Sequence, residues 1–460
     1  MSIEWDLVRR LPATAAAAVV PVFAGEGAEQ VSAEFLGAVG FGGGVGQVLV
    51  VPGLGRAEVL VGLGPRERVD GGVVRAAVAE AVRAVRVGSL AVVVPEGVAG
   101  PVGVRAVVEG VLLGGYRFGG YRGDSGDVGV QRVDIVVEES AEARAALAVG
   151  QVLGSGVLLA RDLVNGFGGL TGPEGFVERA WAISGETGVG CEVWDAHRIV
   201  DEGLGGLGGV GFGGGARGPR LVRLTHAPEG ALGSVALVGN GVVSGAGRRG
   251  DMAGAAVVLA AVSALAVLDC PLRVEAWLPV ASSVGEGASG GRVGEVVRLR
   301  GGTGVEVLSG GVEGQLVMAD VLALAAEGAP GAVVDVAALS PAVGAALGEG
   351  VAAVQGTSAG LVESVRWAGG RAGETVWPLP VPSRGGARRV GADVVAGERR
   401  GSAVEGGGFL SGFVPAGVPW AHVDIHGVAV AGGDRGGWVR GATGFGVRTL
   451  VELLMAPLAV

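Results

Sequence analysis

The first third of the chain alternates between short apolar runs rich in valine and longer segments in which apolar residues recur at helical spacing. The short runs are continuous, as expected for strands that are buried on both faces of a sheet. The expected strands are 19–24, 48–55, 59–64, 89–95 and 133–139, and the expected helices between them are 71–86 and 106–118. Strands that alternate with helices indicate a mostly parallel sheet covered by helices.

A long helical pattern follows over 140–165, and we expect it to connect two domains. Thr171 as N-cap and Pro173 in the first turn then predict the start of another helix. From residue 231 the α/β pattern resumes, with expected strands at 236–241, 273–281, 305–311, 331–339 and 420–430 and expected helices at 252–268, 317–328, 343–350 and 447–458. The predicted class is therefore α/β, with an N-terminal α/β domain over 1–140, a connecting helix over 141–165 and a C-terminal domain over 166–460.

Three features bear on the compartment. The apolar run from Met252 to Leu268 is shorter than the roughly 20 residues that a bilayer requires, and its many small residues favour a buried core helix. The start of the chain carries early acids and has no basic segment ahead of an apolar core, so we expect no signal peptide. Cys191 and Cys270 form no CxxC pair and suit a reducing compartment. A cytoplasmic protein is expected.

Composition excludes several classes of protein. The 94 glycines follow no triplet period and 49% of the residues are hydrophobic, which argues against collagen and against disorder. A net charge of −10 provides no electrostatic footprint for nucleic acid. All 35 basic residues are arginine, so no lysine amine is available to any site. Arginine cannot replace lysine as a metal ligand, because its guanidinium stays protonated.

Several segments recur in the order and spacing of one known family. They are ARDLVN, ALVGNG, GDMAGAAVVLAA, VEVLSGGVEGQLVMAD, AGETVWPLPVP, PWAHVDI and GATGFGVRTLVELL. On these segments the chain resembles the cytosolic leucyl aminopeptidase family over nearly its whole length. The resemblance implies a smaller, macro-like N-terminal α/β domain, a larger aminopeptidase-type α/β/α domain with a central mixed sheet, and a hexamer.

The resemblance also implies a dinuclear metal site, held by one lysine and several carboxylates, and this sequence departs from it at most positions. Asn240 stands at the position of the lysine ligand. Gly245 and Gly311 stand at the positions of two ligand aspartates, and Gln315 at that of the arginine that holds a bicarbonate. The loop that carries the catalytic lysine is shortened to Arg248, Arg249 and Gly250.

Only two of the implied ligands remain, Asp251 and Glu313. Two dications a few ångströms apart repel each other, and only concentrated carboxylate charge holds them. We therefore expect no catalytic residue and no resident cofactor, with at most one weakly bound Mn or Zn ion at this vestigial pair. Without metal, Asp251 is explained as a capping residue of the following helix and Glu313 as the start of the next one.

A second set of metal-binding side chains lies late in the chain. His422, Asp424 and His426 occupy alternate positions of an expected strand, which would place all three on one face. Two imidazoles and a carboxylate make a competent ligand set, so these residues are an alternative metal site. The competing interpretation is a structural strand in which His422 and Asp424 are satisfied by hydrogen bonds.

The losses concentrate in the implied site, whereas the apolar strands and glycine turns remain. The sequence therefore predicts a pseudoenzyme of the leucyl aminopeptidase type. It would act as an oligomeric scaffold, alone or with an active paralogue, or as a peptide-binding accessory protein in peptide or metabolite biosynthesis. The alternative is a weakly active or altered metal-dependent aminopeptidase that uses Asp251 and Glu313.

Overall fold

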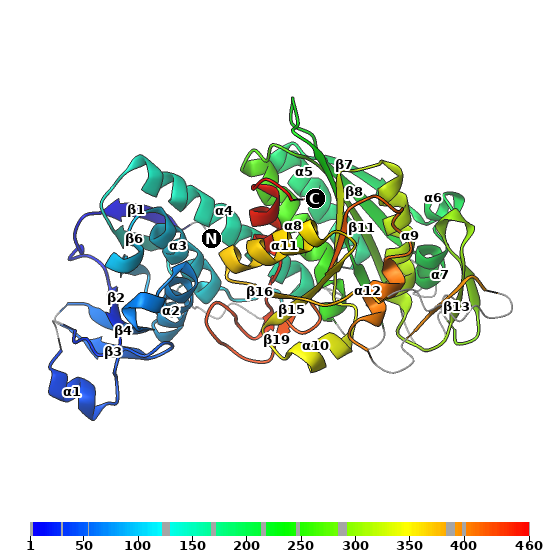
Figure 1. Ribbon diagram of the computed structural model, residues 1–460. Helices are drawn as coiled ribbons and strands as arrows, with labels where there is room; N and C mark the ends of the chain where they lie inside the picture. Colours follow the sequence, from blue (N-terminus) through cyan, green and yellow to red (C-terminus); the bar gives the residue numbers. More distant parts are fainter. Residues whose placement is uncertain are drawn as a thin grey trace. The chain divides into compact units, whose positions relative to one another are not determined.

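A computed structural model describes residues 3–28, 31–53, 55–121, 129–166, 172–212, 218–244, 249–283, 292–382, 392–397 and 402–459. The chain divides into two compact units. The first comprises Met1–Leu158 and Ala431–Arg440, and the second comprises Leu159–Val430 and Gly441–Val460. The predicted α/β class with two units, a smaller one and a larger one, is confirmed (Figure 1).

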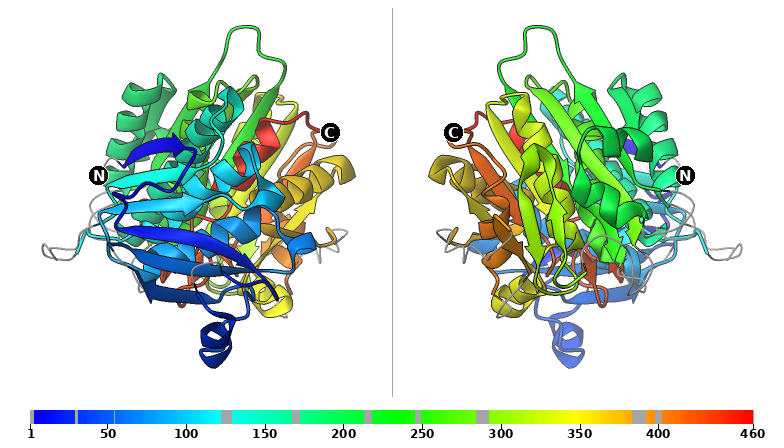
Figure 2. Two further views of the ribbon diagram at one scale, coloured as in Figure 1. Left: turned by 90° about the vertical axis from the view of Figure 1, so that its left-hand side faces the viewer. Right: turned by 90° about the vertical axis from the view of Figure 1, so that its right-hand side faces the viewer.

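The first unit is built on a six-stranded sheet in the order β1-β6-β5-β2-β4-β3, whose strands lie side by side in Figure 2 (left). The strands are β1 (Glu4–Val8), β2 (Ala17–Phe23), β3 (Val48–Pro52), β4 (Ala57–Gly64), β5 (Ser89–Val93) and β6 (Arg132–Val136). Every neighbouring pair is parallel except β3 with β4, which is antiparallel. The expectation of a mostly parallel sheet therefore holds, with one reversed edge strand.

Helices cover this sheet as the apolar pattern predicts. They are α1 (Ala33–Ala38), α2 (Gly71–Ala84), α3 (Pro101–Gly115) and α4 (Ala141–Gly166). Helices α2 and α3 share a core cluster with Val59, Val61 and Leu63 of β4, whereas Leu60 belongs to a second, smaller cluster with Leu36 of α1. Because successive side chains of a strand point to opposite faces, α1 lies on the other face from α2 and α3.

The second unit contains a nine-stranded mixed sheet in the order β16-β15-β18-β14-β9-β11-β8-β7, with β10 paired to β11. The strands are β7 (Gly190–Trp194), β8 (Arg220–His226), β9 (Ser234–Gly239), β10 (Gly241–Ser244), β11 (Arg273–Ser283), β14 (Ala332–Ala337), β15 (Val351–Gly356), β16 (Thr375–Pro378) and β18 (Trp420–Asp424). The central strands β14, β9 and β11 are parallel neighbours. Their carboxyl ends therefore meet at one edge, where ligands of open α/β sheets bind.

The helices of the second unit are α5 (Pro173–Thr187), α6 (Ala196–Asp201), α7 (Gly205–Phe212), α8 (Ala253–Val267), α9 (Glu313–Glu327), α10 (Pro341–Leu347), α11 (Ala359–Ala372), α12 (Glu405–Leu410) and α13 (Val447–Leu454). Helix α9 packs on the face that carries Ala236 and Val238 of β9. Helix α8 packs on the opposite face, where a side chain at Gly239 would meet the backbone oxygen of Gly254 at 2.7 Å. The central sheet is thus covered on both faces, as the right-hand view of Figure 2 shows.

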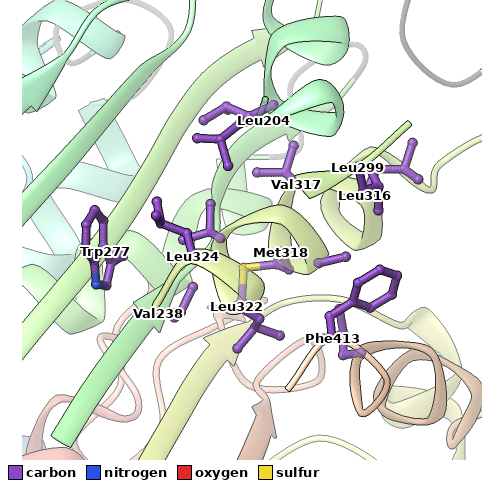
Figure 3. Packing of buried hydrophobic residues seen from close by; sticks show 14 of the residues in the cluster. Leu204, Val238, Trp277, Leu299, Leu316, Val317, Met318, Leu322, Leu324 and Phe413 are labelled. Atoms are coloured by element: carbon purple, nitrogen blue, oxygen red, sulfur yellow. The ribbon is translucent and has the colours of Figure 1, made fainter. Parts of the chain in front are cut away.

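The main core of the second unit surrounds α9 (Figure 3). Met318 and Leu322 of this helix point toward the sheet, and Leu316 and Val317 point toward neighbouring helices and loops. Most residues of α9 are buried, including the polar Gln315 and Asp320. A helix this deeply buried has a fixed position, so its amino end is a rigid wall for any site built there.

Smaller elements complete the unit. A three-stranded sheet contains β12 (Val296–Arg298), β13 (Gly304–Val307) and β17 (Val394–Ala396), β19 (Val430–Ala431) pairs with β20 (Gly441–Ala442), and short 3₁₀ turns lie at η3 (Arg249–Met252) and η4 (Arg300–Gly302). The expected strand 305–311 is therefore part of this small sheet and ends at Val307. By length and composition, α4 and the segment Gly250–Val267 could each cross a membrane, but 72% of the second segment is buried among other residues. That burial fits the predicted core helix.

Candidate functional site

A cavity of about 220 Å³ opens at the amino end of α9, and we call it the α9 pocket. It lies at the carboxyl edge of the central parallel strands. Its lining residues are Asn240, Val242, Asp251, Ser309, Gly310, Gly311, Val312, Gly314, Gln315, Ala338, Leu339, Pro341 and His426. Five positions that the sequence singled out therefore lie together: Asn240, Asp251, Gly311, Gln315 and His426.

Asn240 follows β9 and is buried, with 2% of its surface exposed. Its Nδ2 donates to the backbone oxygen of Asp251 at 3.1 Å, and its Oδ1 accepts from the backbone N–H of Val242 at 3.4 Å. The side-chain amide thus holds together the two segments that flank the pocket. The bond from Val242 is long and an amide oxygen has two lone pairs, so Asn240 could offer a cation at most one neutral ligand atom.

Gly311, Glu313 and Gln315 form the entry to α9. Gly311 has φ +82°, in the left-handed region that favours glycine, so an aspartate at this position would be strained. Glu313 is the first residue of the helix, as the competing interpretation predicted, and its charge there is favourable to the helix dipole. Gln315 is 5% exposed and lines the pocket. The neutral amide of Gln315 thus stands at the position for which the resemblance implies an arginine.

One oxygen of Glu313 is unusual. Its Oε2 is buried, and within the described part of the chain it has no hydrogen-bond partner. A buried carboxylate oxygen without a donor is costly, because the charge has lost water and gained nothing in return. Such an atom marks either a missing partner or a remnant of a site that no longer functions.

Asp251 lies in η3, one residue before the cap position of α8. That cap position is Met252, and its side chain makes no capping hydrogen bond. The interpretation of Asp251 as the N-cap is therefore off by one residue, because the intervening 3₁₀ turn delays the start of the helix. Gly245 and Arg248 lie outside the described residues, and Arg249 is described only in its backbone. Asp251 contributes the acidic side chain of the pocket lining.

The histidine strand is shorter than the sequence predicted. Strand β18 ends at Asp424, so His422 and Asp424 share one face but His426 lies in the following turn. His422 Nδ1 lies 2.6 Å from Asp335 Oδ1, and its Nε2 lies 4.0 Å from Asp424 Oδ2. In the described ranges no three His, Cys, Asp or Glu side chains converge in a way that could hold a metal ion. The alternative ligand set is thus not assembled.

Burial and charge act in opposite directions on His422, which is 1% exposed. Burial lowers the pKa of its imidazole, but the charge of Asp335, the hydrogen bond to Asp335 and the charge of Asp424 outweigh burial and raise that pKa. Asp335 also accepts a hydrogen bond from Trp420 Nε1 at 2.7 Å. Sequence reasoning did not single out Asp335. It lies at an inward position of an apolar strand, where a buried acid signals a buried partner.

Among the described residues, Asp251 is the one acidic side chain that lines the pocket, Glu313 begins the adjoining helix, and the amide of Asn240 is engaged with backbone. These residues offer little of the negative charge that two adjacent dications require. A second, larger cavity of about 650 Å³ is lined by residues of α6, α7, η4 and Glu327. None of the described site residues that the sequence predicted lines that second cavity.

Comparison of the sequence with known protein families agrees with this two-unit α/β fold and its pocket at the amino end of α9. Residues 158–451 match the model of the cytosol aminopeptidase family, catalytic domain, and residues 12–125 match the model of its N-terminal domain. The chain belongs to the cytosol aminopeptidase family.

Individual relatives span nearly the full chain. A probable cytosol aminopeptidase of Corynebacterium diphtheriae is 33% identical over 99% of this chain and 97% of its own, and one of Leifsonia xyli is 37% identical over 93% and 91%. Among solved structures, the bottromycin maturation enzyme BotP is similar with a TM-score of 0.87 and 36% identity, over 96% of this chain and 99% of that one. It has also been solved in complex with Mn. A mutant of tomato leucine aminopeptidase, at 23% identity and a TM-score of 0.87, shares the fold.

Proposed function

We propose that this protein is a member of the cytosol aminopeptidase family that binds peptides in the α9 pocket without hydrolysing them by the dinuclear metal mechanism. The observation that carries the proposal is the engagement of the Asn240 side chain with the backbone of Val242 and Asp251. Together with glycine at 311 and glutamine at 315, it leaves Asp251 and Glu313 as the remaining acids. Two acids do not supply enough charge to hold two adjacent dications.

The chemistry of the lining supports a peptide end as the ligand. Asp251 is the charged group that faces a ligand ammonium, and Val242, Val312 and Leu339 provide apolar surface beside it. One similar protein acts in bottromycin maturation, which supports a role in the biosynthesis of a peptide-derived metabolite. We further propose that the protein is cytoplasmic and that it assembles as a homo-hexamer or with an active paralogue.

The comparisons favour a second candidate, a weak or altered metal-dependent aminopeptidase. The relatives are named as probable aminopeptidases, and BotP has been solved with Mn. In this structure the unpartnered Oε2 of Glu313 is the observation in its favour, because a single cation would give that oxygen a partner. Asp251 and Glu313 would hold the ion between them, and Mn or Zn would be its identity.

Cleavage of aminoacyl nitroanilides separates the two candidates. The purified protein is assayed with added Mn²⁺ or Zn²⁺ beside the Asp251→Asn, Glu313→Gln double variant. An exposed Glu363→Gln variant, whose acid pairs with Arg366 on α11, is the matched control. We expect no turnover above buffer in any of the three. Turnover that disappears in the double variant and persists in the control would establish the second candidate.

Metal content and size give independent tests. We expect less than one cation per chain after dialysis against EDTA and return to Mn²⁺, whereas one cation that the double variant loses would favour the second candidate. Two cations per chain would contradict both. A monomer in light scattering, alone and mixed with an active relative, would refute the proposed assembly.

A further inference from the structure

Asp424, the last residue of β18, is a buried carboxylate that accepts hydrogen bonds from three backbone amides. Its side chain is 2% exposed. Oδ1 accepts the backbone N–H of Leu339 at 3.1 Å and that of His426 at 2.9 Å, and Oδ2 accepts the N–H of Ser340 at 2.9 Å. One acid therefore ties together the segment that leaves β14 and the turn that leaves β18.

These amides belong to the wall of the α9 pocket. Leu339 and His426 line the cavity, and Ser340 is the cap residue of α10, whose first residue Pro341 also lines it. Ser340 makes no side-chain capping bond to α10, and its backbone N–H bond to Asp424 ties this helix start to the end of β18. If the carboxylate moved, two sides of the pocket would move with it.

Contacts among Trp420, His422 and Asp335 hold Asp424 in its position. Trp420, His422 and Asp424 alternate along β18 and share a face. The rings of Trp420 and His422 are stacked, with centroids 6.3 Å apart and planes 14° from parallel, and both rings bind Asp335 of β14. This holds His422 Nε2 toward Asp424, 4.0 Å from its Oδ2.

We infer that Asp424 is the positioning residue of the α9 pocket, and that Trp420, Asp335 and His422 orient it. The inference rests on the proposed function only in taking this pocket as the binding site. An asparagine at position 424 has the same shape but a single acceptor oxygen, so at least one of the three amides loses its partner. The backbone of the pocket wall then opens more readily, whereas β14 and β18 beneath it keep their interstrand hydrogen bonds.

Hydrogen exchange of the whole protein tests the inference without any ligand. In Asp424→Asn we expect the amides of Leu339, Ser340 and His426 to exchange at least tenfold faster, while those within β14 and β18 keep their rates. The matched control is Glu374→Gln. Glu374 is 3% exposed and accepts the N–H groups of Gly446 and Thr449, so only the amides near α13 should respond.

Two further readouts separate positioning from general support. The chain has four histidines, so NMR signals of labelled histidine rings are assignable, and Asp424→Asn should shift His426 but leave His197 and His226 in place. Affinity for the dipeptide Leu-Leu should fall at least tenfold in Asp424→Asn and stay within twofold in Glu374→Gln. If Asp424→Asn does not fold, Trp420→Phe removes the indole hydrogen bond to Asp335 together with part of a fully buried ring, and it should give smaller changes of the same kind.

Wild-type exchange at the three amides would overturn the inference. So would faster exchange spread evenly through β14 and β18, because that pattern reports lost stability. If Leu-Leu fails to bind even the wild-type protein, the proposed function fails, and the exchange and NMR results still decide the role of Asp424.

Discussion

Two of the acids of helix α9, Glu313 and Asp320, lie two turns apart and have opposite surroundings. Asp320 is fully buried, and its carboxylate accepts the backbone N–H groups of Gly206, Leu207 and Arg300 at 2.6, 3.0 and 2.8 Å. Glu313 begins the same helix, and its buried Oε2 has no partner among the described residues.

The difference separates structural charge from functional charge. Asp320 serves the fold, because it satisfies the start of α7 and the 3₁₀ turn η4 that would otherwise bury unpaired amides. Glu313 places a favourable charge in the first turn of α9, but its Oε2 accepts no hydrogen bond from any described residue. Because the α9 pocket opens at this end of the helix, a bound ligand or cation could contact that oxygen.

Removal of the structural acid gives the largest expected effect. In Asp320→Ala three buried N–H groups lose their acceptor, and each costs about 1–3 kcal/mol. We expect the free energy of unfolding to fall by at least about 3 kcal/mol in urea titrations followed by circular dichroism. A loss below about 1 kcal/mol would mean that the two acids of α9 do not differ in the way the contacts imply.

The pH dependence of stability should also follow Asp320. Burial raises the pKa of its carboxyl to about 7, against the opposing hydrogen bonds from Arg300, Leu207 and Gly206 and the charge of Arg300. Between the unfolded pKa of about 4 and the folded value, the folded state keeps a proton that the unfolded state has released. Stability therefore falls as pH rises from about 4 to about 7.

This decline is measured against a variant that cannot titrate. Asp320→Asn should be less stable than wild type at every pH, but the gap between the two should narrow from pH 5 to pH 8. A gap that widens with pH would show that the folded protein prefers the ionised carboxylate.

A smaller effect is expected at the other acid. Glu313→Gln removes a buried charge without a donor, which favours folding, and it also removes a favourable charge from the first turn of α9. These effects oppose each other, so the free energy of unfolding should change by less than about 1 kcal/mol. The same urea titration measures it, and a loss above about 2 kcal/mol would place Glu313 among the structural acids.

The smallest effect is expected from metal. A tight site occupied at 1,000 times its dissociation constant adds about 4 kcal/mol to stability. The pocket offers too little charge for such a site, so 1 mM Mn²⁺ should shift the melting temperature by less than about 2 °C in thermal scans. EDTA should then have an equally small effect. A large rise in melting temperature with Mn²⁺ that disappears in the Asp251→Asn, Glu313→Gln double variant would contradict this expectation. It would identify Glu313 as a metal ligand.

Much of this could be anticipated from particular residues. The valine runs predicted strands where β2, β4, β5 and β6 lie, and the apolar run from Met252 predicted α8 almost to the residue. The resemblance placed Gly311, Gln315 and Asn240 in one site, and all three line the α9 pocket. Local pattern and composition are sufficient for such predictions, because burial and helix spacing act over a few residues.

Other features could not be predicted. Three of them depend on pairing between distant segments: β3 runs antiparallel to β4, β13 belongs to the small sheet, and β18 ends before His426. The partners of Asp335, Asp320 and Asp424 depend on it as well. An acid within an apolar run indicates only that a partner exists somewhere in the fold.

The sequence by itself determined the α/β class, the two-part organisation and the absence of lysine from any site, because these follow from periodicity and composition. Only the tertiary structure decided which charges are satisfied. The amide of Asn240 is engaged with backbone, and Asp320 and Asp424 each accept three backbone amides. Among the described residues, one oxygen of Glu313 has no partner. The physical reason is that a hydrogen bond requires two atoms within about 3 Å, and long-range folding alone brings them there.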